Sequence, residues 1–168
     1  MPDQNHKLSD ARASEHFSWA ELIYSKRAAE KGISNAPPEE CLPLVRDFCT
    51  LILEAIRARF GPVFITSGFR CGLLNALVSK DPNSDHIWTA DRCAADIQVS
   101  PGTPLETVFD WLRLESGLPF DYIILERGKA VDSELDDCIH ISFCRVPRRI
   151  AQAGKTNSAS GFTRVEVV

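Results

Sequence analysis

The segment SDHIWTADRCAADI at residues 84–97 and the segment DCIHISF at residues 137–143 place two histidines and a carboxylate in short, well-defined contexts. These residues are His86, Asp96 and His140. A catalytic zinc ion needs only three protein ligands of the His, Asp, Glu or Cys type, because water or substrate takes the fourth position. The two segments therefore predict a three-ligand metal site.

Strand periodicity supports this hypothesis, because side chains two residues apart on a strand share a face. Residues 94–99 and 138–144 both have the composition of strands. His140 shares its face with Cys138, Ser142 and Cys144, and Asp96 shares its face with Ala94 and Gln98. The opposite faces are apolar. We expect the apolar faces to pack on helices and the polar faces to form the floor of a cleft.

The remaining pattern indicates that helices come first and strands cluster later, which favours an α+β fold. Ser18 and Glu21 form a capping-box signal for a helix over about 19–31, and an apolar stripe predicts a second helix over about 39–59. Further helices are expected over about 73–78 and 104–114, and further strands over 63–66 and 120–126. We expect one domain over residues 1–150 and a loosely held tail over 151–168.

Composition excludes several classes of protein. With 168 residues the chain fits one domain, and its formal charge of −4 does not favour nucleic acid as a partner. The polar N-terminus has no apolar core of the kind found in signal peptides, and no apolar run reaches membrane-spanning length. We therefore expect synthesis in the cytoplasm, no membrane span and a monomer. The six cysteines include no CxxC pair and are expected to be reduced.

The motifs resemble those of the zinc peptidases of the M15 family, which include D-alanyl-D-alanine carboxypeptidases and phage cell-wall endopeptidases. Family members carry S-x-H, then A-x-D or A-A-D-I, and later a strand similar to W-[IV]-H-[IV]-S. Here these are residues 84–86, 94–97 and 138–142. The resemblance implies that His86, Asp96 and His140 bind Zn²⁺. It also implies a hedgehog/DD-peptidase-like fold, in which helices pack on one side of a small, mostly antiparallel sheet and a zinc cleft lies on the other.

The resemblance also suggests the catalytic residues. Asp137, three residues before His140, takes the place of the family's acidic general base, with Glu134 and Asp136 as alternatives in the same acidic run. Arg70, in the segment TSGFR, takes the place of the arginine that holds the polarised carbonyl or substrate. Without the resemblance, the acidic run would be a solvated loop and Arg70 would pair with a nearby carboxylate. Glu126 is either a partner of the site or a surface charge.

One departure from the family pattern lies between the first two ligands. His86 and Asp96 are ten residues apart instead of seven, and residues 88–93 replace the usual glycine. A longer loop costs little free energy, so it could bulge outward without moving the ligands. Asp91 becomes a rival ligand, and Trp88 is a candidate for reshaping the cleft.

Together these observations predict a zinc metallopeptidase that hydrolyses a bond in the stem peptide of bacterial peptidoglycan, of the carboxypeptidase or endopeptidase type. The absence of a signal peptide suits a phage-type lysis enzyme that acts on the cell wall after release. The longer interval between His86 and Asp96 favours the alternative, a non-catalytic M15-like module that binds cell-wall peptide or has a structural role.

Overall fold

Short helices make up the first part of the computed structural model, which describes residues 8, 11–79, 81–127, 137–155 and 161–168. α2 (Trp19–Ile23) begins with the predicted capping box between Ser18 and Glu21. The single helix predicted over 19–31 is wrong, because Tyr24 is extended and the Ser25 side chain caps a second helix, α3 (Lys26–Lys31). No helix in the described part of the chain is both long enough and apolar enough to cross a membrane.

The predicted helix over 39–59 is confirmed as one continuous helical segment. It consists of a 3₁₀ turn η1 (Glu39–Cys41), α4 (Leu42–Phe48), a π-helical turn η2 (Cys49–Leu53) and α5 (Glu54–Phe60). The apolar stripe is buried, as the three- and four-residue spacing predicts. Gly61, whose φ is 83°, ends the segment.

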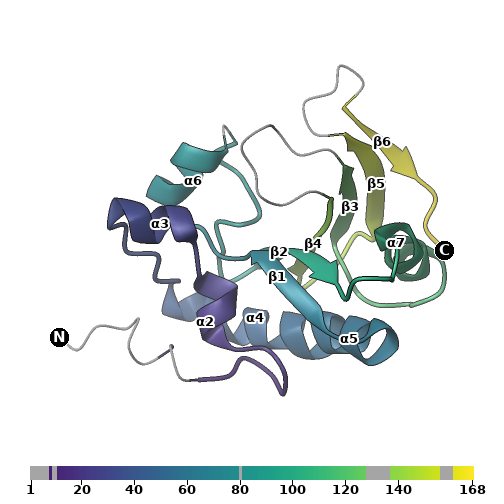
Figure 1. The fold of residues 1–168 in the computed structure, drawn as a ribbon, viewed down its shortest axis with the longest axis horizontal. Coiled ribbons are helices and arrows are strands. Elements are labelled where there is room, and N and C mark those ends of the chain that lie inside the picture. The colour runs from purple at the N-terminus through teal and green to yellow at the C-terminus, as the bar shows by residue number, and fades with distance from the viewer. Residues whose placement is uncertain (1–7, 9–10, 80, 128–136, 156–160) are drawn as a thin grey trace.

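A six-stranded sheet follows, in the order β1-β2-β4-β3-β5-β6 (Figure 1). The strands are β1 (Val63–Ser67), β2 (Arg92–Val99), β3 (Tyr122–Arg127), β4 (Cys138–Cys144), β5 (Ile150–Lys155) and β6 (Phe162–Val165). Four of the five neighbouring pairs are antiparallel, and only β3 and β5 are parallel. α6 (Gly72–Val78) joins β1 to the loop before β2, and α7 (Leu105–Leu114) joins β2 to β3. All four predicted strands and both predicted short helices are confirmed to within a few residues.

The prediction of a loosely held tail is wrong, because the chain after residue 149 adds two strands to the sheet. Ile150 donates its backbone N–H to the carbonyl of Asp121, and β5 then pairs along the whole of β3. β6 folds back on β5, and Arg149 donates to the carbonyl of Val168 at 2.8 Å. The last strands therefore extend the sheet through backbone pairing, although their own composition is weakly apolar.

The two faces of the sheet differ as the strand periodicity predicts. The apolar residues of β2, β3 and β4, such as Ile97, Ile123 and Ile141, belong to the core, where α4 and α7 pack against these strands. The rings of Phe48 on α4 and Phe143 on β4 stack with their centroids 6.0 Å apart. Residues of the opposite face line a cleft. One largely antiparallel sheet with helices is compatible with the predicted α+β class, and the hedgehog/DD-peptidase fold stays a prediction.

Candidate metal centre

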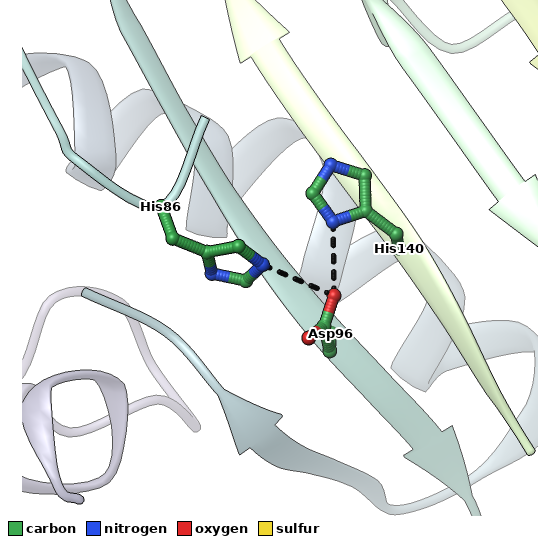
Figure 2. A group of neighbouring side chains, drawn as sticks. All are labelled: His86, Asp96 and His140. Atoms are coloured by element: carbon green, nitrogen blue, oxygen red, sulfur yellow. Dashed lines mark hydrogen bonds and ion pairs between the residues drawn. The ribbon is translucent and has the colours of Figure 1, made fainter. Parts of the chain in front are cut away.

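Three side chains meet on the polar face of the sheet (Figure 2). Asp96 on β2 and His140 on β4 are direct cross-strand partners, and their side chains lie on the same face. One carboxylate oxygen, Asp96 Oδ1, lies 2.9 Å from His140 Nδ1 and 3.2 Å from His86 Nε2. One ligand atom from each of the three residues falls within 4.8 Å of the other two. The structure thus brings together the three residues that the sequence predicted as a group.

His86 reaches this point from a loop, and the segment after β1 fixes its orientation. Its Nδ1 lies 2.7 Å from the carbonyl oxygen of Gly68, and its own carbonyl accepts from the backbone N–H of Arg70 at 2.9 Å. Gly68 has to be glycine, because a Cβ there would collide with the backbone carbonyl of Leu22. The close approach of α2 to the end of β1 therefore sets where the His86 ring points.

Burial and charge together set the protonation of the cluster. Burial raises the pKa of Asp96, but the facing His86 and His140 outweigh it and hold that pKa well below its usual value. Burial also lowers the pKa of His86. Burial opposes charge on His140 too, but the carboxylates of Asp85 and Asp96 raise its pKa to about 9. Without a metal, these shifts favour the ionised form of Asp96, the neutral form of His86 and the doubly protonated form of His140.

The donor set fits a divalent metal ion. Two imidazole nitrogens and one carboxylate oxygen are a common ligand set of catalytic zinc, and all three residues are buried. Donors around a tetrahedral zinc, with bonds of about 2.0–2.1 Å, lie about 3.3 Å from one another. The two distances from Asp96 Oδ1, 2.9 and 3.2 Å, differ from this value by only a few tenths of an ångström, and the donor atoms of the two histidines lie within 4.8 Å of each other. The site could therefore hold a metal with little rearrangement of the strands.

Arg70 lies against this cluster. Its Nη2 is 3.4 Å from Asp96 Oδ2, and its Nε and Nη2 donate to Ser67 Oγ at 3.1 and 2.8 Å. It pairs with a carboxylate, as the simpler interpretation of this residue predicted, and it also lines the cleft. Its role toward a substrate stays a prediction.

The cluster opens into a cleft of about 520 Å³, whose floor includes residues of β2, β3 and β4. Glu126 on β3 is half-buried and lines the cleft, and its role as a partner of the site stays a prediction. Asp137 is not among the described residues of the lining; its carboxylate, 41% exposed, lies 4.0 Å from Arg127. The alternative bases Glu134 and Asp136 lie outside the described residues. Besides Asp96, the cleft is lined by three acidic residues that the family motif does not specify, Asp81, Asp85 and Glu126.

Sequence reasoning missed Asp85, although it stands within the S-x-H motif. Its carboxylate lines the cleft and lies 3.9 Å from His140 Nε2 and 3.0 Å from Arg92 Nε. The sequence offered one indication of its role, since Asp85 stands beside His86 in a segment that also carries Arg92.

The longer segment between His86 and Asp96 is tightly packed. The Trp88 side chain is 1% exposed, donates to the carbonyl of Ala94 at 2.9 Å and packs on Phe69 with ring centroids 5.3 Å apart. Trp88 therefore packs in the core and is not among the described residues that line the cleft. Asp91 is exposed and does not belong to the three-residue cluster found in the described part of the chain, so the structure does not support it as a rival ligand.

Comparison with known proteins agrees with this geometry. No curated protein matches the chain. A model of the family described as Peptidase M15 matches residues 15–142. This range begins just before α2, ends within β4 and contains all three residues of the cluster. Membership of this family indicates a hydrolytic enzyme. Because the match covers well over half of the sequence, the chain belongs to the peptidase M15 family.

Proposed function

We propose that this protein is a zinc-dependent peptidase that hydrolyses a peptide bond in the stem peptide of bacterial peptidoglycan, as a carboxypeptidase or an endopeptidase. The observation that carries the proposal is the convergence of His86, Asp96 and His140 at the base of a cleft in a member of the M15 family. A zinc ion at such a site lowers the pKa of a bound water and polarises the scissile carbonyl.

The residues around the cluster have separable roles in this proposal. Asp96, held ionised by the two histidines, supplies the negative ligand. Ser67 and Asp96 hold the guanidinium of Arg70 beside the cluster, where its donors form a fixed fork. In that position it would donate to the oxygen that becomes negative as the carbonyl is attacked.

Asp137 remains our proposed general base, from its place three residues before His140. Glu126 is the second candidate, because its residue lines the cleft and pairs in register with Cys138, the neighbour of Asp137. The two are separated by comparing Asp137→Asn and Glu126→Gln in the zinc-loaded protein. The variant that loses hydrolysis by 100-fold or more, the order of a general-base effect, while it retains zinc identifies the base.

The experiment that tests the function uses purified protein and a synthetic stem pentapeptide, with products identified by mass spectrometry. We expect hydrolysis by the zinc-loaded protein, its loss after chelation, its return with added zinc, and its absence in His86→Ala and His140→Ala. Asp91→Asn is the matched control. The product masses tell whether a terminal residue or an internal bond is cut.

A zinc-loaded protein that cleaves neither the pentapeptide nor intact cell walls would refute the enzyme proposal. If that protein still sedimented with cell walls, the binding-module alternative would replace it. The monomeric state, the cytoplasmic origin and a phage source stay predictions. The division between a catalytic domain of residues 1–150 and the segment 151–168 also stays a prediction. The family match ends at residue 142 and so does not reach that boundary.

A further inference from the structure

The Asp85 side chain faces His140, the histidine of the cluster that is distant from it in sequence. Its Oδ2 lies 3.9 Å from His140 Nε2, and its side chain is 20% exposed. His140 directs its other ring nitrogen, Nδ1, to Asp96 at 2.9 Å. Asp85 and Asp96 therefore lie against the two nitrogens of the same ring, with Asp85 on the nitrogen that does not point into the cluster.

This arrangement corresponds to a common requirement of histidine ligands. A neutral imidazole that gives one nitrogen to a metal carries its proton on the other, and a carboxylate or a backbone carbonyl usually accepts that proton in a hydrogen bond. For His86, the outer nitrogen lies 2.7 Å from the carbonyl oxygen of Gly68. For His140, the carboxylate of Asp85 stands on the corresponding side, and the 3.9 Å separation would close by a small side-chain movement.

Arg92 fixes the carboxylate of Asp85. Arg92 Nε lies 3.0 Å from Asp85 Oδ1, and Arg92 Nη2 donates to the carbonyl of Asn83 at 3.3 Å. The guanidinium thus contacts the loop at two points around the S-x-H motif. One oxygen of Asp85 thus faces Arg92 and the other faces His140, and the contact with Arg92 Nε is an ion pair without hydrogen-bond geometry.

The longer segment between His86 and Asp96 places Arg92. Thr89 and Arg92 close a turn: Thr89 N–H donates to the Arg92 carbonyl at 2.9 Å, and Arg92 N–H donates to Thr89 Oγ1 at 3.2 Å. Trp88, buried directly before this turn, anchors one end, and β2 begins at Arg92. The departure from the family spacing therefore brings a cation to the edge of the cluster.

We propose that Asp85 is a positioning residue for His140 and that Arg92 holds Asp85, so that the longer segment braces the metal site. The inference rests on the proposed metal binding, and it assigns the segment a role that neither the motif nor the family match provides. If the ion pair were only a surface contact, its removal would leave metal affinity unchanged.

The test measures Zn²⁺ affinity by competition with a chromophoric chelator, and the visible spectrum of the Co²⁺-substituted protein. The variants are Asp85→Ala, Asp85→Asn, Arg92→Ala and the double variant Asp85→Ala/Arg92→Ala. The matched controls are Asp91→Asn, from the same segment, and Arg145→Ala, an exposed arginine after β4. Thermal unfolding of each metal-free protein reports whether the fold is intact.

We expect Asp85→Ala to weaken zinc affinity about 10- to 100-fold, the usual effect of removing such a partner, and to alter the Co²⁺ spectrum. Arg92→Ala should weaken it less, and should have no further effect once Asp85 is absent. The controls should bind as the wild type does. Asp85→Asn keeps the shape of the side chain and should weaken zinc affinity at least threefold. If Asp85→Ala does not fold, the result for Asp85→Asn tests the proposal.

Wild-type affinity in Asp85→Asn or Asp85→Ala would overturn the proposal, as would an equal effect of Arg92→Ala with and without Asp85. A wild-type protein that binds no zinc would overturn it together with the metal site. A protein that binds zinc in an Asp85-dependent way but hydrolyses no stem peptide would refute only the proposed function, because affinity is measured without substrate.

Discussion

Replacing Trp88 by phenylalanine tests whether the longer segment is an integral part of the fold. Trp88 is 1% exposed, and its indole N–H donates to the carbonyl of Ala94 at 2.9 Å. Phenylalanine removes that hydrogen bond, which costs about 1 kcal/mol net. It also leaves a void of roughly 40 Å³, which costs about 1 kcal/mol at about 24 cal/mol per Å³. We therefore expect the free energy of unfolding to fall by about 2 kcal/mol, and by about 3 kcal/mol if the freed carbonyl finds no partner.

The assay is urea unfolding of the metal-free protein. The variants are compared only where the dependence of the unfolding free energy on urea concentration has the same slope, so that a shift of the midpoint reports stability alone. Trp111→Phe is the matched control. Trp111 lies on α7, is only partly buried, and packs edge-on against Phe60 with ring centroids 5.3 Å apart. The ring contact survives that substitution, so we expect a loss below about 1 kcal/mol. A Trp88→Phe loss under about 0.5 kcal/mol, or one no greater than that of Trp111→Phe, would refute the view that Trp88 anchors the segment.

Three further predictions concern the protonation of His140, the close packing of Gly68, and the ion pair between the buried Asp121 and the exposed Arg148. Burial opposes charge on His140, but two facing carboxylates raise its pKa to about 9, so below that pH a zinc ion must displace a proton from His140. Competition with a chelator should therefore show zinc affinity rising by up to tenfold per pH unit between about pH 7 and 9 and levelling off above that pH. An affinity that does not change with pH would contradict this prediction. Gly68→Ala should lower both stability and zinc affinity, because the new Cβ would collide with the Leu22 carbonyl. The control is Gly72→Ala, whose Cβ would have no other atom within 4 Å, and it should be neutral or stabilising by up to about 1 kcal/mol. Burial raises the pKa of Asp121, but Arg148, which donates Nε and Nη2 to its two oxygens, lowers that pKa overall. The stability that the ion pair contributes is therefore present above the unfolded pKa of about 4, and it is lost as the pH falls through the lower folded pKa. Because Arg148 is 62% exposed, water screens the pair, and Asp121→Asn should cost about 1 kcal/mol in urea unfolding at pH 7. The difference from wild type should shrink below about pH 4, and a constant difference across that range would contradict the ion pair as its cause.

Strand periodicity predicted the part of the site that depends on local geometry. The alternation along 138–144 placed His140 on the polar face, and the same argument placed Asp96 on the polar face of its own strand. The structure confirms both faces, since these residues pair across β2 and β4 with the rings and carboxylate on the cleft side. Which residue of one strand stands opposite which of the other depends on pairing between distant segments. The periodicity alone therefore could not predict the 2.9 Å contact.

The failures of prediction also have physical causes. The segment 19–31 is rich in helix formers, so the break at Tyr24 was hidden; it occurs because Ser25 accepts from the Ala28 N–H and starts a new helix. Residues 150–155 carry alanine, glutamine and glycine, which favour strands weakly. They form β5 because β3 offers them an open edge along which to pair. Glu126, one of the acidic residues that line the cleft, lies on β3, outside the motifs of His86 and His140, so only the fold places it there.

The spacing between ligands is a weaker constraint on a metal site than the family motif suggests. His86 lies 3.2 Å from Asp96 even though ten residues separate them, because its position is set from the other side, by the Gly68 carbonyl and the Arg70 N–H after β1. The three additional residues only have to close a loop, which costs little entropy, and the burial of Trp88 offsets that cost. A longer interval is therefore compatible with three converging ligands, so the interval alone gives no reason to prefer the non-catalytic module. The feature that distinguishes this chain from the family pattern is what the segment carries, an arginine 3.0 Å from a carboxylate beside the cluster, rather than its length.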